Sequence, residues 1–337
     1  MTLSSHIITL LAAASLVLSS CEHKELCYDH PHSVPARINV DWSLFTEEQP
    51  TGMTVSLYRE GSDKPHTALT NNIAYADFNI APATYHALVY NQSTTEFGTL
   101  HFDNTNDFNR AAVYANTVQS RWYKTRGDNE RLIYAPEWFA TDAAQYVEAP
   151  ETESDAYTRN GTRCVVATLT PRCVVYTIIV NIHMLNIYNV RSARASLDGL
   201  ADGYMLGKQQ PTTSLGTQLL EEWTMTRDTD NPANGTLTAH ITSFGLPANH
   251  QNIASANHLR LSLLLVDNKT QKDFDFDVGN AFIRGSEADG SEVDLSLSIN
   301  ETISTPIPDV KPEGGASSGF DATVDDWGDE VNIDIGV

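Results

Sequence analysis

The chain has 337 residues, with 43 Asp and Glu against 21 Lys and Arg, which gives a formal net charge of −22. Nucleic acids and anionic membrane surfaces both attract Lys and Arg, so this charge excludes either as a partner bound through a basic surface. Hydrophobic residues make up 41% of the chain, which is too apolar for a disordered protein, and the length predicts two domains at about 150 residues each. The charge is uneven, because residues 273–337 contain 16 Asp and Glu against 2 basic residues.

The N-terminus predicts a lipoprotein signal peptide. Residues 1–20 contain no Asp, Glu, Lys or Arg, and the apolar segment 7–18 is shorter than the roughly 20 residues that span a membrane. It ends in the sequence LSSC at residues 18–21, where small residues admit the signal peptidase and a thiol takes the lipid. We therefore predict a lipid on Cys21 and a tether over residues 21–35. The alternative is an ordinary signal peptide followed by an incidental cysteine.

The mature chain predicts an all-β fold. Apolar and polar residues alternate with a period of two, which is the pattern of strands that bury one face. The clearest alternating segments are residues 38–44, 53–57, 174–182, 259–265 and 293–299. Turn-forming clusters separate the segments, and residues 108–124 offer only a weak helical pattern.

Changes in composition predict where the domains begin and end. A polar stretch at residues 151–163 predicts a linker between an N-terminal β-sandwich over residues 36–150 and a C-terminal one over residues 164–337. Within the C-terminal part, Pro and Gly are concentrated in residues 305–319, which predicts a hinge.

A terminal strand is predicted after this hinge, within residues 320–337. Its apolar residues alternate with polar ones up to the last position: Val331, Ile333, Ile335 and Val337. The strand either completes the C-terminal sandwich, as a strand next in sequence usually does, or pairs with a partner protein.

The N-terminal tether contains four potential metal ligands: His23, Cys27, His30 and His32. They could hold Zn or Cu, but their spacing matches no closed tetrahedral site, so a solvated tether is the preferred interpretation and no cofactor is predicted. Acidic residues elsewhere begin like calcium loops or line one face of a strand: Asp103, Asp107, Asp228, Asp230, Asp273, Asp275 and Asp277. The first four lack the later ligands of such a loop and predict turns. The last three predict a charged sheet edge, with a cation site as the alternative.

No catalytic constellation is predicted. Residues 315–319 match the G-x-S-x-G pattern of hydrolases, but they lie in the hinge and the last histidine, His258, precedes them. Paired carboxylates such as Glu221 and Glu222 do not by themselves make an active site. Four aromatic residues could stack on sugars, although aromatic residues in β-sandwiches more often pack in the core: Trp122, Tyr123, Trp138 and Trp223.

Several segments resemble a known family. Residues 21–42 (CEHKELCYDHPHSVPARINVDW), 171–182 (PRCVVYTIIVNI), 190–204 and 319–335 are similar to Bacteroides-type lipoproteins of the fimbrillin superfamily. The resemblance implies two tandem transthyretin-like, Greek-key β-sandwiches of seven strands each. It also implies a non-enzymatic fimbrial subunit or anchor at the outer membrane, exposed at the cell surface or built into a fimbrium. The alternative is a glycan-binding surface lipoprotein, whose ligand is a glycan or a host surface.

The resemblance also implies how such a subunit would meet its partners. Polymerising subunits of the superfamily lose an N-terminal segment to a trypsin-like protease and receive a strand from a neighbouring subunit, which pairs with the opened sheet edge. Arg37 is the only Lys or Arg between Lys24 and Arg59, so it is the candidate cleavage site. Because Arg37 opens the first predicted strand instead of following it, its position favours an uncleaved anchor or tip subunit.

Overall fold

The computed structural model describes residues 33–46, 49–62, 64–127, 129–152, 155–158, 161, 163–253, 257–284 and 296–313. Across these residues the strands form five sheets. Helical structure in the described part is limited to the 3-10 helix η1 (Ile187–Asn189) and the short helix α2 (His250–Ile253), and neither could cross a membrane. The predicted all-β class is confirmed.

The first sandwich packs a three-stranded sheet against a five-stranded sheet. The three-stranded sheet runs in the order β4 (Tyr75–Ile80), β1 (Val34–Val40) and β9 (Val165–Leu169). The five-stranded sheet runs β10 (Arg172–Cys173), β8 (Ala140–Glu148), β5 (Thr84–Asn91), β2 (Met53–Arg59) and β3 (His66–Thr70). Alternating apolar residues such as Ile38 of β1 and Val55 of β2 are fully buried between the sheets, as the sequence predicts.

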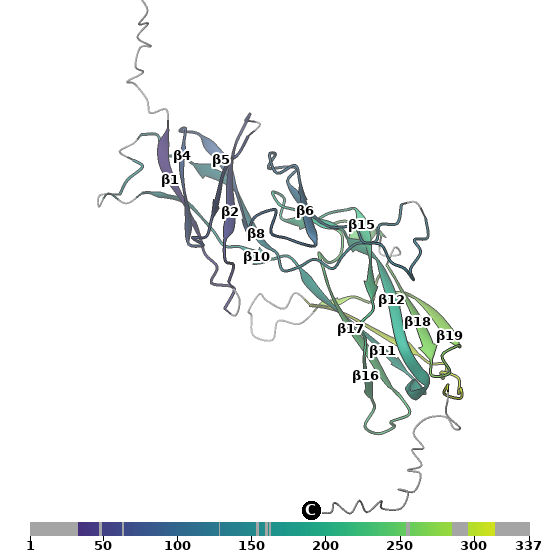
Figure 1. The fold of residues 1–337 in the computed structure, drawn as a ribbon. Helices are drawn as coiled ribbons and strands as arrows, with labels where there is room; N and C mark the ends of the chain where they lie inside the picture. Colours follow the sequence, from purple (N-terminus) through teal and green to yellow (C-terminus); the bar gives the residue numbers. More distant parts are fainter. Residues whose placement is uncertain are drawn as a thin grey trace, which may run out of the picture.

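The second sandwich lies beyond the first, so that the two follow one another in an elongated molecule (Figure 1). One sheet runs β16 (Thr224–Arg227), β17 (Gly235–Ser243), β11 (Tyr176–Met184), β21 (Ser296–Ile303) and β20 (Ile283–Arg284). The other runs β15 (Leu215–Leu220), β12 (Val190–Ala201), β18 (His258–Leu265) and β19 (Gln271–Asp277). The alternating residues of β11 and β18 form the core between them, for example Ile178 and Leu261.

A further four-stranded sheet joins the two halves of the chain. It runs β14 (Gln210–Pro211), β13 (Gly203–Met205), β7 (Ala112–Ala115) and β6 (Leu100–Asp103). Apolar side chains from both halves form a core around it, which we call the shared core. Its fully buried members include Leu88 and Phe139 from the first half and Leu206 and Phe244 from the second.

The structure differs from the sequence-based expectations at three places. β9 and β10 follow the expected linker 151–163, yet they pair with β1 and β8 of the first sandwich and cover edges that would otherwise be unpaired. The chain therefore crosses to the second sandwich later than expected. Residues 108–124 contain the strand β7 instead of a helix. In β2 the polar residues Thr54 and Ser56 are also buried, because the shared core covers the outer face of that sheet.

Candidate functional site

A loop from the first half of the chain is attached to the edge of β15 in the second. We call residues 117–131 the Trp122 loop. At its base the amide of Val118 donates to the carbonyl of Leu132 at 2.9 Å. The amide of Ile133 donates to the carbonyl of Thr217 at 3.0 Å, and the amide of Thr217 donates to the carbonyl of Arg131 at 2.8 Å. The returning segment of the loop therefore pairs with β15 as an added strand would.

Close packing at Gly216 lets this segment approach β15. A Cβ atom on Gly216 would lie 2.4 Å from Cδ1 and 2.8 Å from Cγ1 of Ile133, which is well inside van der Waals contact. Ile133 is itself 2% exposed and belongs to the shared core. The absence of a side chain at residue 216 is thus what allows Ile133 to sit against the strand.

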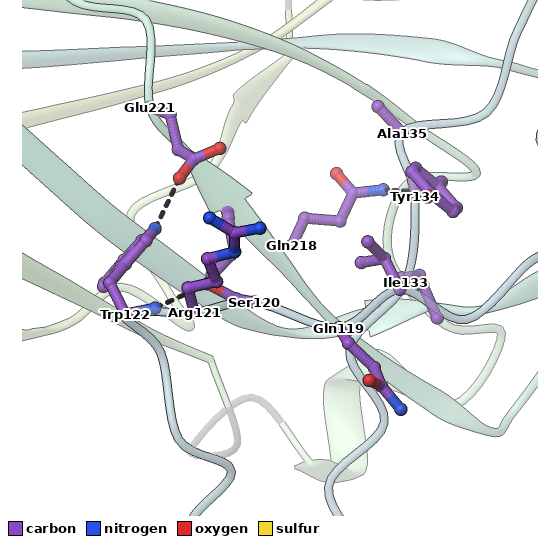
Figure 2. A pocket seen from close by; sticks show the side chains of 11 residues that line it. Gln119, Ser120, Arg121, Trp122, Ile133, Tyr134, Ala135, Gln218 and Glu221 are labelled. Atoms are coloured by element: carbon purple, nitrogen blue, oxygen red, sulfur yellow. Dashed lines mark hydrogen bonds between the residues drawn. The ribbon is translucent and has the colours of Figure 1, made fainter.

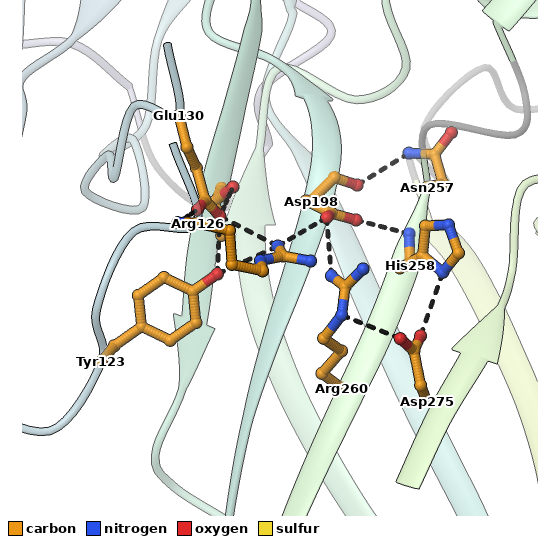
Figure 3. A network of polar contacts seen from close by, with 9 residues as sticks. Tyr123, Arg126, Glu130, Asp198, Asn257, His258, Arg260 and Asp275 are labelled. Atoms are coloured by element: carbon orange, nitrogen blue, oxygen red, sulfur yellow. Dashed lines mark hydrogen bonds and ion pairs between the residues drawn. The ribbon is translucent and has the colours of Figure 1, made fainter. Parts of the chain in front are cut away.

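Ion pairs hold the tip of the loop on the outer face of the sheet (Figure 3). Arg126 of the loop and Arg260 of β18 each donate to the Oδ2 atom of Asp198 on β12, both at 2.7 Å. Arg260 also donates through Nε to Asp275 of β19 at 2.9 Å, and Arg126 donates to Glu130 at 2.9 Å. We call these five residues the Asp198 network. Because it joins several partly buried charges, it positions the loop better than an isolated surface pair would.

Hydrogen bonds keep Glu130 of this network ionised. Burial alone would raise the pKa of its carboxyl group, but donors surround it, and together they lower that pKa below its usual value. They include the Tyr123 hydroxyl at 2.5 Å and the backbone amide of Arg126 at 2.5 Å. Burial and the bond to Glu130 raise the pKa of Tyr123. At neutral pH the pair is therefore a neutral phenol donating to a carboxylate, which fixes the loop.

A pocket lies between the loop and the end of β15 (Figure 2). Its volume is about 440 Å³, and we call it the Trp122 pocket. It is lined by Val118, Gln119, Ser120, Arg121, Trp122, Ile133, Tyr134, Ala135, Gln218, Leu219 and Glu221. Figure 2 shows Trp122 and Tyr134 on opposite sides, with Gln218 between them. The lining thus combines two aromatic rings with amides, one cation and one carboxylate.

The side chain of Trp122 is fixed by its neighbours. Its Nε1 atom donates to Oε1 of Glu221, and its backbone amide donates to Oγ of Ser120 at 3.3 Å. The guanidinium of Arg194 lies over the ring at 5.4 Å from its centroid, within the range of a cation–π contact. These contacts hold Trp122 in one orientation.

Gln218 carries an unsatisfied acceptor in this pocket. The residue is 1% exposed, and its Nε2 atom donates to the carbonyl of Tyr134 at 3.4 Å. Within the described part of the protein, no group donates a hydrogen bond to its Oε1 atom. A buried acceptor left in this state costs about 1–3 kcal/mol, so a group that donates to it would bind favourably.

The structure separates the four aromatic residues that the sequence singles out. Trp122 and Tyr123 lie together, with their ring centroids 5.6 Å apart, and Glu221 joins them. Trp138 instead packs edge-on against Phe45 in the first sandwich. Trp223 packs against the core of the second sandwich, as the commoner interpretation expects. No sequence pattern pointed to Arg121, Gln218 or Asp198, which lie far apart along the chain.

Arg37 lies inside β1, between β4 and β9. Its guanidinium donates to both carboxylate oxygens of Asp77, at 2.8 and 2.9 Å, and covers the ring of Tyr75 at 3.7 Å from its centroid. The hydrogen bond from Arg37 lowers the pKa of Asp77. The candidate cleavage site is therefore an ion-paired residue of a central strand.

The acidic residues take part in local contacts. Asp107 caps a turn by accepting from the amide of Asn109 at 3.0 Å, and Asp228 lies 2.9 Å from His183. Asp275 lies on the edge strand β19 and forms an ion pair with Arg260 of the neighbouring strand β18. This position favours the interpretation as a charged sheet edge. Among the described residues, no group of three or more His, Cys, Asp or Glu side chains could hold a metal.

Other predicted site residues lie outside the described residues. These are Cys21, His23, Cys27, His30, His32, residues 315–319, Val331, Ile333, Ile335 and Val337. Of the remaining cysteines, Cys164 and Cys173 are both free thiols.

The fold defines a double β-sandwich protein with a surface pocket formed by both halves of the chain. The family model described as "Domain of unknown function (DUF5119)" matches residues 20–221, and the chain belongs to that family. A curated Bacteroides ovatus protein, named "Putative fimbrium anchoring subunit Fim4B", is 21% identical over an alignment of 342 positions that covers 97% of each chain. The resemblance to fimbrial proteins of Bacteroides is thereby confirmed as a distant relationship.

Two solved structures share the fold. One, titled a "putative adhesin" from Bacteroides ovatus, superimposes with a TM-score of 0.53 at 17% identity and covers 77% of this chain and 87% of its own. Another "putative adhesin", from Bacteroides thetaiotaomicron, gives a TM-score of 0.51 at 10% identity, with 82% and 93% covered. At these identities the two structures establish a common architecture.

Proposed function

We propose that the protein is a non-enzymatic outer-membrane lipoprotein that serves as an anchor, tip or accessory subunit of a fimbrium. The observation that carries this proposal is the end-to-end relationship to a protein named as a fimbrium anchoring subunit, since 97% of both chains align. The pairing of two sheets in each half supports the tandem sandwiches that the resemblance implies, although the described sandwiches contain eight and nine strands instead of seven each. The protein acts by holding other fimbrial subunits at the cell surface.

A lipid on Cys21 attaches the protein to the outer membrane. The first described strand, β1, lies at one end of the elongated molecule, and the described chain ends near the other (Figure 1). A lipid upstream of β1 therefore leaves the second sandwich directed away from the membrane. Cell fractionation tests this step: wild-type protein should partition with outer membranes, and Cys21→Ser should not. An unchanged distribution of Cys21→Ser would refute the lipid anchor.

We expect the N-terminal strand to be retained, as an anchor or tip role would require. Cleavage after Arg37 would remove Val34 and Ala36, both fully buried, from the core of the first sandwich. It would also break the ion pair to Asp77. We expect the N-terminus isolated from cells to begin at Cys21. An N-terminus at Ile38 in the assembled fimbrium would instead indicate a polymerising subunit.

Strand addition connects the protein to its neighbours. The residues that carry this step are Val331, Ile333, Ile335 and Val337, which either complete the second sandwich or enter a partner. Deletion of residues 320–337 separates the two: lost stability of the isolated protein indicates completion, and lost assembly with intact stability indicates donation. If neither changes, both roles are refuted.

Co-purification tests the function as a whole. A tagged chain expressed in its natural host should bring down a polymer of other subunits, and Cys21→Ser should shift that polymer from cells to the medium. Recovery of the lipidated protein without other subunits would refute the fimbrial role. The second candidate function, glycan binding at the cell surface, is favoured by the Trp122 pocket.

A further inference from the structure

We propose that the Trp122 pocket is a binding subsite for a neutral sugar residue of a glycan, stacked between Trp122 and Tyr134 and hydrogen-bonded to Gln218. This site is additional to the fimbrial role and does not depend on it. An anchor, a tip subunit or an unassembled lipoprotein could each carry it.

The size and aromatic walls of the pocket suit a sugar ring. Its volume of about 440 Å³ lies within the roughly 300–1,000 Å³ of ordinary small-molecule sites. One face of a pyranose presents C–H groups, whose partial positive charge complements the negative face of an aromatic ring. Trp122 is held by Glu221 and Ser120, while Tyr134 is 45% exposed. The walls are therefore in place and at least one aromatic side chain is accessible.

The polar lining matches the hydroxyl groups of a sugar. Each hydroxyl both donates and accepts, so it needs a mixture of acceptors and donors around it. The Glu221 carboxylate accepts from Trp122 through Oε1, and its other oxygen, Oε2, can accept from a ligand hydroxyl. Arg121 and Gln119, from the same segment of the loop as Trp122, supply donors. Planar amide, guanidinium and carboxylate groups thus surround the aromatic walls.

The unsatisfied Oε1 atom of Gln218 points to a ligand that donates hydrogen bonds. Because this atom is itself buried, the side chain has to turn toward the pocket before a sugar hydroxyl can donate to it and remove the cost of the unsatisfied acceptor. A carboxylate, sulfate or phosphate group at this position would supply only acceptors and would leave the atom unsatisfied. Gln218 therefore distinguishes between neutral and anionic ligands.

The charges of the pocket and of the whole chain also favour a neutral ligand over an anionic one. The pocket lining contains one cation, Arg121, and one carboxylate, Glu221, so its formal charge is zero. The whole chain carries −22, and its field repels anionic glycans from the surface. A neutral hexose or N-acetylhexosamine needs no excess of cations in the pocket and is not repelled by the negative charge of the chain.

A crevice left over from the packing of the loop would have different features. Packing alone would bury the aromatic ring of Tyr134 and pair the polar atoms that it encloses. Other buried polar atoms of the described residues are also unpaired, such as Oδ1 of Asn189, so Gln218 supports the proposal through its place beside an exposed aromatic wall. A ligand in the pocket would cover Tyr134 and donate to Gln218.

The test uses the folded lipid-free protein and a glycan array that carries neutral and anionic oligosaccharides. Saturation-transfer NMR then measures the affinity of each glycan that binds. Neutral hexose or N-acetylhexosamine glycans should bind. Trp122→Ala and Gln218→Leu should each weaken binding by about tenfold or more, the loss of about 1.4 kcal/mol of contact energy. Tyr146→Ala, which removes an aromatic residue that is 81% exposed and lies outside the pocket, should bind as the wild type does.

Gln218→Leu also separates ligand binding from a structural role. Leucine removes the unsatisfied Oε1 atom together with the long Nε2 hydrogen bond to the Tyr134 carbonyl, 3.4 Å in length, and these two effects oppose one another. The urea midpoint should therefore stay nearly unchanged while binding is lost. A lower midpoint would show that the amide serves folding and would overturn its assignment to the ligand. Three further outcomes overturn the proposal: no neutral glycan binds, only anionic glycans bind, or neutral glycans bind equally to both pocket variants.

Discussion

Replacing Gly216 with alanine tests whether the Trp122 loop is seated on β15 by close packing. The added Cβ atom would meet Ile133 at 2.4 Å (Cδ1), 2.8 Å (Cγ1) and 3.3 Å (Cγ2). Ordinary contact begins near 3.4 Å, so Ile133 has to move by about 1 Å, or the loop has to lift from the strand. Because Ile133 is 2% exposed, it has little room to move.

The expected cost follows from overpacking. Forcing one extra methyl group into a packed core costs about 1–3 kcal/mol, and the loss of chain entropy in the unfolded state returns about 0.4–1 kcal/mol of that. Gly98→Ala is a matched control, because its Cβ atom would find only Oε1 of Glu137, at 4.0 Å. It carries the same entropic contribution without the clash. Gly216→Ala should therefore be less stable than Gly98→Ala by about 1–3 kcal/mol.

Urea unfolding followed by tryptophan fluorescence measures both variants. A second comparison uses Ile133→Val, which removes the Cδ1 atom that would lie closest to the new methyl group. The double variant Gly216→Ala/Ile133→Val should be more stable than the sum of the single changes predicts, by about 0.5 kcal/mol or more. Equal stability of Gly216→Ala and Gly98→Ala, or strict additivity in the double variant, would refute the close-packing argument.

Three other changes test the ion pair, the shared core and the buried thiol. Asp77→Asn removes a carboxylate whose pKa is lowered by Arg37, so its stabilisation is present above the unfolded pKa of about 3.9 and is lost as pH falls through the folded value. Melting temperatures of wild type and variant should therefore differ near neutral pH and converge in acid, and a constant difference would contradict this. Phe244→Ala empties a fully buried site of the shared core and should cost about 3–5 kcal/mol within a single urea transition, whereas an independent transition for the first sandwich would argue against coupling of the halves. Burial raises the pKa of the Cys173 thiol, so iodoacetamide should label it more slowly in native protein than in urea, and equal rates would show that the thiol is accessible.

The strands themselves could be predicted from the sequence. The alternation at Ile178, Val180 and Ile182 recurs in the structure as the buried face of β11, and residues 259–265 do the same for β18. Such a pattern is local, because a strand that buries one face must place an apolar side chain at every second residue. The β class, the turns between strands and the edge charges of β19 follow from the same local chemistry.

Part of the candidate site was also visible in the sequence. The adjacent residues Trp122 and Tyr123 were among the aromatic candidates, because two neighbouring aromatic rings outside an alternating strand are easily noticed. Gln218 could not be identified in this way. Its role comes from being buried without a donor beside a loop that precedes it by about a hundred residues, and a single glutamine carries no local signal.

The sequence alone determined the strands with strong alternation and the apolar face that each of them buries, since both depend on neighbouring residues. The tertiary structure decided which strands pair. It placed β9 beside β1, built a sheet from strands of both halves, and buried Thr54 and Ser56 on the face that the pattern assigned to solvent. The physical reason is that a period of two in the sequence indicates that one face of a strand is buried, but it does not indicate which other strand or loop buries it. The Trp122 pocket exists only because the shared core brings the loop of one half onto the sheet of the other.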